Sequence, residues 1–346
     1  MNFCSDNVTG VAPEIMQALA AANRGTAWPY GNDDWTRKVE VQLCDIFERK
    51  VRAFPVATGT ASNSLALATM APPYSAILAH DAAHVMVDEC GAPEFYSGGA
   101  KMISVGGANG KMTPELVAAA IARFRSTDPH QAPLAAISIT NSTESGTVYR
   151  PEEVKAIADL AKAEKMRVHM DGARFANAVA SLGVAPKAVT WQAGVDALSF
   201  GATKGGCMAA ECVVFFDEAL AQSFEYRRMR AGHLVSKMRF VSAQLNAFFA
   251  DGLWLTMARH ANDMAQRLAQ GLQRIPGARI ASPVDANELF VVLPPEVIKG
   301  LRDAGAEFYD WIGEPNLIRL VTAWDTDAAK VEKFLKVAGE VAAKAA

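Results

Sequence analysis

An aspartate and a lysine each follow a strand-like run of the sequence, and together they suit one cofactor chemistry. Asp171 comes directly after the apolar run at 166–170, and Lys204 lies in the turn GATKGG after the run at 195–200. Pyridoxal phosphate is held by a lysine that forms a Schiff base with it and by a carboxylate that pairs with its pyridinium nitrogen. The lysine becomes a nucleophile when burial or a neighbouring cation removes its proton. The two residues therefore suggest a pyridoxal-phosphate site.

A third segment offers a place for the phosphate group. The turn TGTASN at 58–63 puts Gly59 and Thr60 at the start of an expected helix, at about 62–70. Backbone N–H groups at a helix start can bind a phosphate. Each segment alone is commonplace, because an Asp after a strand is usually a cap and a Lys in a glycine-rich turn is usually solvated. Their order along the chain, each after a strand, is more specific and favours the cofactor site.

The elements that must position these residues alternate between strand and helix. A helix is predicted from Pro114, since Thr113 is a good cap and positions 117, 120, 121 and 124 make one face apolar. Pro151 opens a second helix of the same kind. Short apolar runs predict further strands at 134–139 and 212–216. This alternation indicates an α/β fold with a mainly parallel sheet, whose strand ends hold the ligand.

The last third of the chain predicts a smaller α/β domain. Residues 224–250 are expected to form one long helix, and the pattern changes after Gly252. The sequence then predicts, in order, a helix at 253–275, strands at 289–293 and 317–322, and a terminal helix from about Asp327. We therefore expect a large cofactor-binding domain at 1–250, with an N-terminal arm at 1–14, and a small domain at 251–346.

Composition excludes several classes of protein. The chain has 346 residues, of which 51% are hydrophobic and 21% charged, and its net charge is −3. These values exclude a disordered chain and a strongly basic nucleic-acid-binding protein. The longest uncharged run, 53–80, contains two prolines and several polar residues, so we expect no membrane span and no secretory signal. Five scattered cysteines without a C-x-x-C motif argue against disulfides and structural zinc, and favour a cytoplasmic protein.

Motifs spread over most of the chain resemble a known family. They are SDNVTG at 5–10, PYGNDD at 29–34, TGTASN at 58–63, HVMVDECGA at 84–92, HMDGAR at 169–174, ATKGG at 202–206 and RLVT at 319–322. Together they resemble the low-specificity L-threonine aldolases, which are pyridoxal-phosphate enzymes of the aspartate aminotransferase fold (fold type I). This resemblance implies a PLP-dependent transferase-like fold and a homotetramer built as a dimer of dimers, with sites at subunit interfaces.

The resemblance also implies roles for individual residues. Lys204 matches the lysine that binds the cofactor covalently, and Asp171 the partner of the pyridine nitrogen. The other matches are Gly59 and Thr60 for the phosphate, His84 stacked on the cofactor ring, Arg174 near the cofactor hydroxyl and the substrate carboxylate, Ser5 and Arg319 for that carboxylate, His130 near the substrate hydroxyl, and Tyr30 and Glu89 lining the site. His84, His130 or a water relayed by Glu89 is the expected base.

One stretch departs from the family pattern. Family members carry GGGMRQ, whose arginine helps to bind phosphate, whereas this chain has RAGHLVSKMRF at 230–240. Val235 falls where the arginine is expected, and either Lys237 or Arg239 substitutes for it or the phosphate is held differently. The basic residues of this region are otherwise a solvated helix face or part of a subunit interface; they are Arg227, Arg228, Arg230, Lys237 and Arg239.

Plainer explanations remain open for some residues. His80 and His84 would form an i, i+4 pair on a helix, but HDAAH lacks the glutamate of HExxH, so we expect no metal site. His84 could be a core residue and His130 a surface loop residue. Arg319 lies inside the apolar run LIRLVT, and a buried arginine needs an anion, which a substrate carboxylate would supply.

The expected reaction is reversible cleavage of L-threonine, L-allo-threonine and related β-hydroxy-α-amino acids to glycine and an aldehyde. A preference for phenylserine, or another reaction of the same fold (β-elimination, racemisation or transamination), is the alternative. A cofactor-free binding or assembly protein on this fold is a third hypothesis, although the intact Lys204, Asp171 and Arg174 argue against it.

Overall fold

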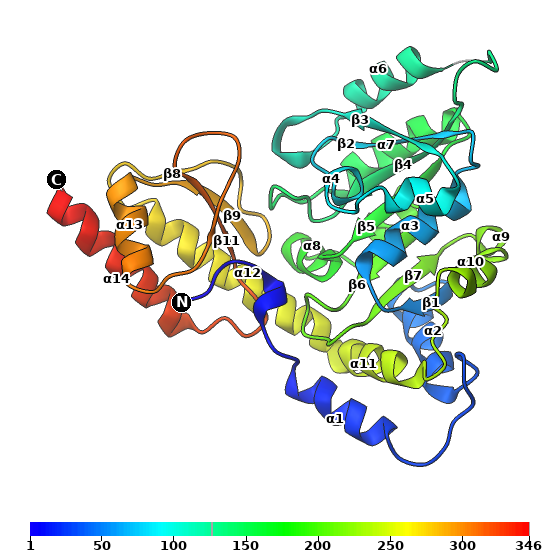
Figure 1. The fold of residues 1–346 in the computed structure, drawn as a ribbon, viewed down its shortest axis with the longest axis horizontal. Helices are drawn as coiled ribbons and strands as arrows, with labels where there is room; N and C mark the ends of the chain where they lie inside the picture. The colour runs from blue at the N-terminus through cyan, green and yellow to red at the C-terminus, as the bar shows by residue number, and fades with distance from the viewer. Residues whose placement is uncertain (126, 346) are drawn as a thin grey trace.

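A seven-stranded sheet forms the centre of the larger part of the molecule (Figure 1). The structure is a computed structural model that describes residues 1–125 and 127–345. The strand order is β1-β7-β6-β5-β4-β2-β3. The strands are β1 (Arg52–Val56), β2 (Ala76–His80), β3 (Lys101–Val105), β4 (Leu134–Thr140), β5 (Arg167–Gly172), β6 (Ala197–Gly201) and β7 (Glu211–Phe215).

The sheet is parallel from β3 to β6, and β7 runs antiparallel to both of its neighbours. Strands β2 and β6 are buried along their whole length, as expected for strands covered by helices on both faces. The α/β class with a mainly parallel sheet, predicted from the sequence, is therefore confirmed. The strands predicted at 134–139, 166–170, 195–200 and 212–216 are present as β4, β5, β6 and β7 with shifted ends.

Helices cover both faces of this sheet, and their starts follow local sequence signals. Those of ten or more residues are α1 (Pro13–Ala22), α2 (Asp34–Phe47), α3 (Gly59–Met70), α6 (Pro114–Phe124), α7 (Pro151–Ala163) and α11 (Arg239–Phe249). The shorter ones are α4 (His84–Val87), α5 (Ala92–Ser97), α8 (Phe175–Leu182), α9 (Glu218–Ala221) and α10 (Phe224–Arg230). Thr113 Oγ1 accepts the N–H of Leu116, which confirms the predicted start of α6.

Two helix predictions need correction. Helix α3 starts at Gly59 rather than near residue 62, because Thr58 Oγ1 accepts the N–H of Ala61 and caps the first turn. The single long helix predicted over 224–250 is wrong, since α10 ends at Arg230 and α11 begins at Arg239. Gly232 between them has a φ of 77°, a left-handed conformation that ends a helix.

A second, four-stranded antiparallel sheet forms the smaller part, in the order β10-β11-β9-β8. Its elements are α12 (Leu253–Leu272), β8 (Arg279–Ile280), β9 (Glu288–Val292), α13 (Pro295–Asp303), β10 (Tyr309–Asp310), β11 (Leu317–Val321) and α14 (Ala328–Ala345). The predicted strands at 289–293 and 317–322 and the terminal helix are confirmed within one residue of β9, β11 and α14.

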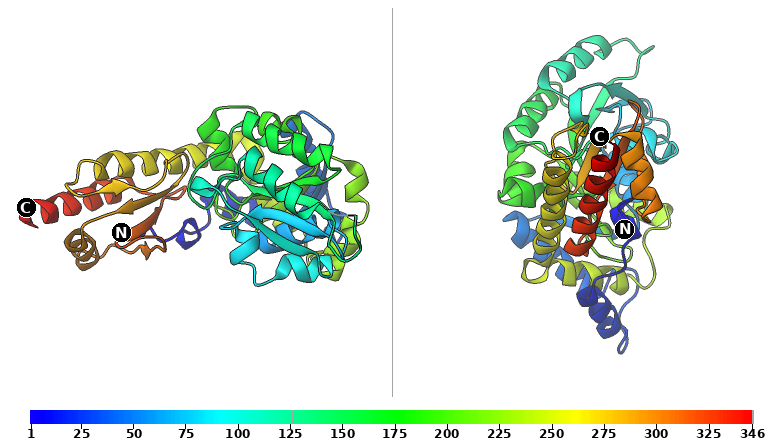
Figure 2. Two further views of the ribbon diagram at one scale, coloured as in Figure 1. Left: turned by 90° about the horizontal axis from the view of Figure 1, so that it is seen from above. Right: turned by 90° about the vertical axis from the view of Figure 1, so that its left-hand side faces the viewer.

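Helix α12 joins the two parts, which Figure 2 shows as an elongated whole with the N-terminus beside the smaller part. Trp254 and Met257 near its start pack into the core of the large sheet, whereas Met264 and Leu268 pack into the core of the small one. Phe3 from the N-terminal arm also belongs to the second core. The expected domain boundary near residue 250 stays a prediction. No helix in the described residues is long and apolar enough to cross a membrane.

Candidate active site

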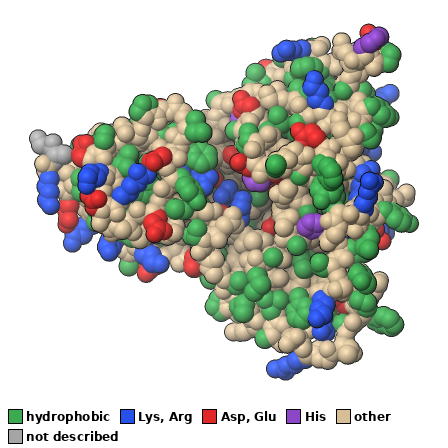
Figure 3. All heavy atoms as spheres, in the orientation of Figure 1, with side chains coloured by type: hydrophobic (Ala, Val, Ile, Leu, Met, Phe, Trp, Pro, Cys, Tyr) green, Lys and Arg blue, Asp and Glu red, His purple; other side chains and the backbone are tan. Residues whose placement is uncertain are grey.

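A cavity of about 410 Å³ lies at the carboxyl ends of β4, β5 and β6. This is the edge of an open α/β sheet at which ligands bind. The side chains and backbone that line it come from six segments: Asn7; Ala57, Thr58, Gly59, Thr60 and Asn63; His84; Thr140, Ser142 and Glu144; Asp171, Ala173 and Arg174; and Thr203, Lys204, Ala209 and Glu211. Figure 3 shows basic, acidic and histidine side chains gathered at the hollow between the two parts of the molecule.

Asp171 is held rigidly in the floor of this cavity. Its side chain is buried, and its two oxygens have separate donors: Oδ1 accepts the N–H of Ala173 at 2.9 Å, and Oδ2 accepts Asn63 Nδ2 at 2.8 Å. Beneath it, His169 is fixed between Ser138 and Ser199, and burial lowers the pKa of His169 to about 4. The strand thus presents one fixed carboxylate to the cavity above a neutral, fully bonded histidine.

Lys204 lines the same cavity from the turn after β6. Its ammonium group has no hydrogen-bond or ion-pair partner among the described residues. Lys111 and Lys155, in contrast, pair with acidic side chains. An amine without a structural partner is available for covalent chemistry. The structure therefore brings together the two residues, Asp171 and Lys204, that the sequence singled out.

The start of α3 forms a phosphate-sized cradle beside them. Thr58 caps the helix, and the N–H groups of Gly59 and Thr60 belong to its first turn, where no intrahelical acceptor exists. A side chain added at Gly59 would meet no atom within 4 Å, so the helix start is open on that side. The cradle, the carboxylate and the unpartnered lysine all border one cavity, and this donor set fits pyridoxal phosphate.

His84 stands over the cavity at the first position of α4, oriented by a buried glutamate. Nδ1 of His84 lies 2.8 Å from Glu89 Oε1, which also accepts Asn63 Nδ2 at 2.9 Å. The hydrogen bond to Glu89 raises the pKa of His84 against the effect of burial, and burial raises the pKa of Glu89. Asn63 therefore links the His84–Glu89 pair to Asp171, so that the four side chains form one network.

Arg174 and Arg319 are both engaged by carboxylates of the chain. Arg174 donates to both oxygens of Asp6, at 2.7 and 3.2 Å, and its Nη1 lies 3.2 Å from Glu288 Oε2. Arg319 Nη1 lies 3.3 Å from Glu288 Oε1, the other oxygen of that carboxylate. The guanidinium carbon of Arg319 lies 4.6 Å from the centre of the Trp311 ring. Burial works to raise the pKa of Asp6, but the ion pair with Arg174 outweighs it and holds the pKa low.

This network corrects one expectation. Glu288 supplies an anion to Arg319, which is only partly buried, so a substrate carboxylate is not required to explain its place in the strand. Arg174 lines the cavity, whereas Arg319 and Ser5 do not. Ser5 Oγ instead accepts the N–H of Asn7 at 3.1 Å and caps the short turn of the N-terminal arm.

Two further residues expected at the site lie outside the cavity of this chain. His130 precedes β4, so it is at the opposite edge of the sheet, about 20 Å from the cavity at the usual strand rise. Its side chain is 90% exposed and bonded to Asp128. Tyr30 is about half exposed in the loop before α2, where its N–H donates to Ser236 O. Within one chain, neither residue reaches Lys204.

Within this chain, the structure does not bring either candidate for the phosphate arginine to the cavity. Lys237 is exposed, Arg239 donates to Gly25 O, and neither lines the cavity. His233 approaches the phosphate turn instead, with Nδ1 3.4 Å from the N–H of Ala57. Arg228 is buried behind β1, where Nη1 donates to Pro55 O. The cluster is therefore not a uniformly solvated helix face.

Two glutamates of the cavity were missed by the sequence reasoning. Burial raises the pKa of Glu144 to about 7, with Asp171 as the next cause, and burial raises the pKa of Glu211 to about 7. Glu144 lies in the loop that follows β4, and Glu211 opens β7. A search of the whole loop after the strand predicted at 134–139 would have included Glu144.

The two histidines considered for a metal site belong to different elements. His80 ends β2 and His84 begins α4, so the two histidines are not an i, i+4 pair on one helix. His80 is bonded to Gly107 O and to the N–H of Ala82. No group of three or more histidine, cysteine, aspartate or glutamate side chains is arranged to hold a metal ion in 1–125 and 127–345.

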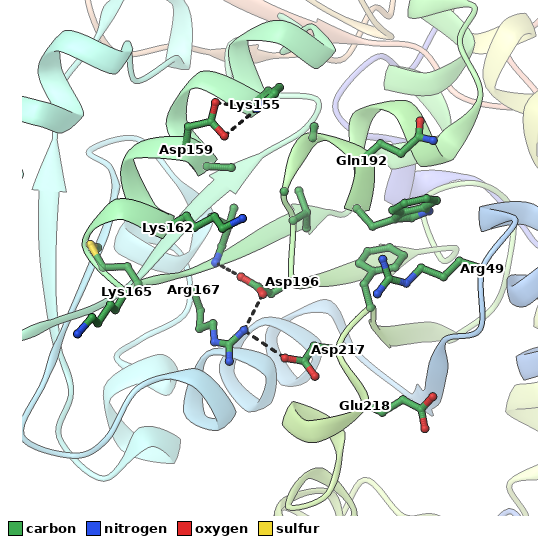
Figure 4. A pocket seen from close by; sticks show the side chains of 18 of the residues that line it. Arg49, Lys155, Asp159, Lys162, Lys165, Arg167, Gln192, Asp196, Asp217 and Glu218 are labelled. Carbon is green, nitrogen blue, oxygen red and sulfur yellow. Dashed lines mark hydrogen bonds and ion pairs between the residues drawn. The ribbon is translucent and has the colours of Figure 1, made fainter.

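A larger groove, of about 920 Å³, lies at the amino ends of β5 and β6 (Figure 4). Arg167 bridges Asp196 and Asp217, at 2.9 and 3.2 Å, and Lys155 pairs with Asp159. Most of its charges thus neutralise one another at a solvent-exposed surface, and Lys204 and Asp171 are at the other edge of the sheet. We therefore place the active site in the smaller cavity.

A seven-stranded α/β sheet with a helix-start cradle, a buried aspartate and an unpartnered lysine at its strand ends defines a pyridoxal-phosphate enzyme of fold type I. Comparison with known proteins narrows this class. The family model described as "Beta-eliminating lyase" matches residues 2–294. A low specificity L-threonine aldolase of Pseudomonas aeruginosa is 42% identical over 334 residues, which are 96% of this chain and 96% of that protein.

A second relative with the same name, from Pseudomonas sp. (strain NCIMB 10558), is 41% identical over 96% of this chain and 95% of its own. The solved structure of Leishmania major threonine aldolase superposes with a TM-score of 0.93 at 26% identity and covers 99% of both chains. A Sphingomonas wittichii serine palmitoyltransferase, at 14% identity and a TM-score of 0.73 over 100% of this chain and 87% of its own, shares the fold. The chain belongs to the beta-eliminating lyase family and, within it, to the low-specificity L-threonine aldolases.

Proposed function

We propose that this enzyme is an aldehyde-lyase that cleaves L-threonine, L-allo-threonine and related β-hydroxy-α-amino acids to glycine and an aldehyde, with pyridoxal phosphate as cofactor. The observation that carries the proposal is the meeting of Lys204, Asp171 and the Gly59–Thr60 cradle in one cavity of a chain that is 41–42% identical to threonine aldolases. Pyridoxal phosphate, when bound, supplies an electron sink that stabilises negative charge on the substrate Cα.

The residues of the cavity have separate roles in binding the cofactor and the substrate. Lys204 would provide the amine for covalent attachment, and the first-turn N–H groups of α3 would bind the phosphate. Asp171, fixed by Asn63 and Ala173, would keep the ring nitrogen of the cofactor protonated. His84, oriented by Glu89, would contact the cofactor ring. Arg174 is the cation of the cavity that can orient a substrate carboxylate, and a bidentate contact would fix its geometry.

Binding of that carboxylate requires a rearrangement around Arg174 and Arg319. Their guanidinium groups are shared with Asp6 and Glu288, so two cations already face two anions. A substrate carboxylate would add a third anion and compete with these contacts. We propose that Arg319 and Ser5 complete the carboxylate site when the small part and the arm adjust to the substrate.

We further propose a homotetramer, built as a dimer of dimers, in the cytoplasm. The exposed apolar side chains Met16, Trp28 and Tyr30 on and after α1 support an interface there. A partner chain is also the one source from which Tyr30 and His130 could approach a cavity that they do not reach in their own chain. The five cysteines are free thiols, in keeping with a reducing compartment.

An absorbance spectrum of the purified protein, followed by addition of L-threonine and assay of acetaldehyde and glycine, tests the function. A visible cofactor band together with both products supports it. The variant Lys204→Ala should lose the visible band of the covalent cofactor linkage and all turnover. A normal band in that variant would remove Lys204 from the site.

Racemisation is the second candidate reaction, because an alanine racemase of Cochliobolus carbonum is 26% identical over 318 residues, which are 89% of this chain and 79% of that protein. Incubation with L-alanine and chiral analysis decides between the two. Formation of D-alanine without acetaldehyde from threonine would favour the racemase.

A further inference from the structure

The end of β4 and the loop after it present a polar wall to the cavity, formed by Thr140, Ser142 and Glu144. Two of its oxygens, Ser142 Oγ and Glu144 Oε2, are buried and have no hydrogen-bond partner among the described residues. Buried polar atoms without partners are rare and costly in folded proteins. A wall with two such atoms beside Lys204 is suited to a ligand that brings its own hydroxyl or amine.

We propose that Glu144 is the acid–base group that exchanges the proton of the substrate β-hydroxyl. This inference rests on the proposed function and adds to it a residue that the family resemblance does not assign. In the cleavage direction the hydroxyl proton passes to the Glu144 carboxylate as the Cα–Cβ bond breaks. The electron pair of that bond stays on Cα, and the former hydroxyl oxygen becomes the aldehyde carbonyl. In the reverse direction Glu144 returns the proton to the oxygen.

The two oxygens of Glu144 are placed differently, as a proton-exchanging carboxyl requires. Oε1 is anchored, since it accepts hydrogen bonds from the backbone N–H of His84 at 2.8 Å and from the hydroxyl of Thr140 at 3.1 Å. Oε2 has no such anchor, and rotation of the carboxyl group exchanges the positions of the two atoms. The anchor ties the side chain to the backbone at the start of α4 and leaves Oε2 as the oxygen without a partner.

The electrostatic surroundings favour proton exchange near neutral pH. Burial, and then Asp171 from β5, raises the pKa of Glu144 to about 7. The other charged or titratable groups of the cavity are His84 from α4, Arg174 before α8, Lys204 after β6 and Glu211 from β7. A general acid–base group works best when its pKa is close to the operating pH.

The other candidates for this role are less well placed. His130 is at the far edge of the sheet, and Glu89 is occupied by His84, Asn63 and Ser64. His84 has Nδ1 tied to Glu89, and its position at the start of α4 suits it to contact the cofactor ring. Glu144 is the carboxyl next to His84 that lines the cavity and keeps an oxygen without a partner.

The variant Glu144→Gln tests the proposal. Glutamine keeps an oxygen that can accept from His84 and Thr140 but cannot carry the hydroxyl proton. We expect kcat for L-threonine cleavage to fall by about 100-fold or more, with an unchanged visible cofactor band. Exchange of the glycine α-proton with solvent deuterium needs the cofactor and Lys204 but no β-hydroxyl, so it should stay within about threefold of wild type.

Thr140→Val is the matched control, since it removes one hydrogen bond to Glu144 and keeps the carboxyl. Loss of this bond should raise the pKa of Glu144 further, because Thr140 contributes a lowering effect. The limb of the kcat profile that belongs to Glu144 should then move to higher pH, whereas it should vanish in Glu144→Gln. A readout without turnover is infrared difference spectroscopy of the protein free of substrate. One protonated carboxyl that titrates near pH 7 should disappear in Glu144→Gln.

Two results would overturn the assignment. One is threonine cleavage by Glu144→Gln within about threefold of wild type. The other is a parallel loss of glycine exchange, which would make Glu144 a group that positions the cofactor or His84. A wild-type protein that binds cofactor and exchanges glycine but cleaves no β-hydroxy amino acid would instead refute the proposed function itself.

Discussion

The imidazole of His84 owes its orientation to Glu89, whose carboxylate is inaccessible to solvent while the ring is 39% exposed. Such a pair behaves as a unit: the buried acid fixes one ring nitrogen and leaves the other toward the cavity. Asn63 connects Glu89 to Asp171. A change at Glu89 therefore affects both His84, which is expected at the cofactor ring, and Asp171, which is expected at the ring nitrogen.

Substitution of Glu89 should therefore move the titration of His84. In Glu89→Gln the pKa of His84 should fall, because the hydrogen bond to Glu89 is the largest cause that raises it and burial then dominates. NMR titration of the histidine ring protons measures this. The exposed ring of His130, at the other end of the sheet, gives reference signals that the substitution should leave unchanged. An unchanged His84 curve would show that the pair is absent in solution.

The sequence predicts those site residues that can be recognised from their residue type and from their position directly after a strand. Lys204, Asp171, Gly59, Thr60, His84 and Arg174 are all found around the cavity. Glu288 and Glu144 could not be found in this way, because their importance comes from contacts across long sequence distances or from burial. Glu288 reaches Arg174 from 114 positions along the chain only after the small sheet folds against the large one.

Helix α3 connects local sequence signals to the site, because its capped first turn is also the phosphate cradle. The strands beside this helix have apolar sequences, and short apolar runs predict buried strands. Most strands of the large sheet could therefore be predicted. The break between α10 and α11 could not, since the residues between them keep a helix-compatible composition apart from Gly232. There the tertiary contact between Tyr30 and Ser236 accompanies a non-helical path.

The cap of α3 should matter for the cofactor as well as for stability. Thr58→Ala removes the acceptor for Ala61 N–H and should cost about 1 kcal/mol of unfolding free energy. Because the same turn carries Gly59 and Thr60, the affinity for pyridoxal phosphate should also fall. Thr113→Ala at the start of α6 removes an equivalent cap away from the cavity. Urea denaturation of Thr113→Ala should show a similar loss of stability, without any change in cofactor affinity. Equal cofactor affinities in the two variants would show that the cap of α3 has no role in cofactor binding.

Across the whole molecule, a single ionic network joins three parts of the chain. Asp6 belongs to the N-terminal arm, Arg174 to the large part, and Glu288 and Arg319 to the small part. Figure 1 shows the arm lying beside the small part before α1 turns away. Asp6 of the arm and Glu288 of the small part therefore both contact Arg174 in the wall of the cavity, so the relative placement of the three parts determines how Arg174 is held.

The arm contributes stability through Asp6 in a manner that depends on pH. Its pKa is lower in the folded chain than the ordinary value near 4, so the contribution is present above that value and is lost as the pH falls through the folded pKa. Asp6→Asn leaves the buried Arg174 with fewer anions and should cost about 3 kcal/mol at pH 7. Urea denaturation should show this difference shrinking below pH 4. A constant difference, or one equal to that of the exposed Asp34→Asn, would contradict the role of the ion pair.

The same network implies how the substrate carboxylate must enter. Arg319 shares Glu288 with Arg174, so removing Arg319 should leave Glu288 held by Arg174 alone and strengthen the internal competitor of the substrate. Arg319→Ala should therefore raise KM for every amino-acid substrate, by about tenfold or more for a lost charged contact, with little change in the visible cofactor band. Arg279→Ala, which removes an exposed pair with Glu314 on the same sheet, should leave KM unchanged. If Arg319→Ala also leaves KM unchanged, the carboxylate is bound by Arg174 without help from the small part, and closure of the two parts around the substrate is unnecessary.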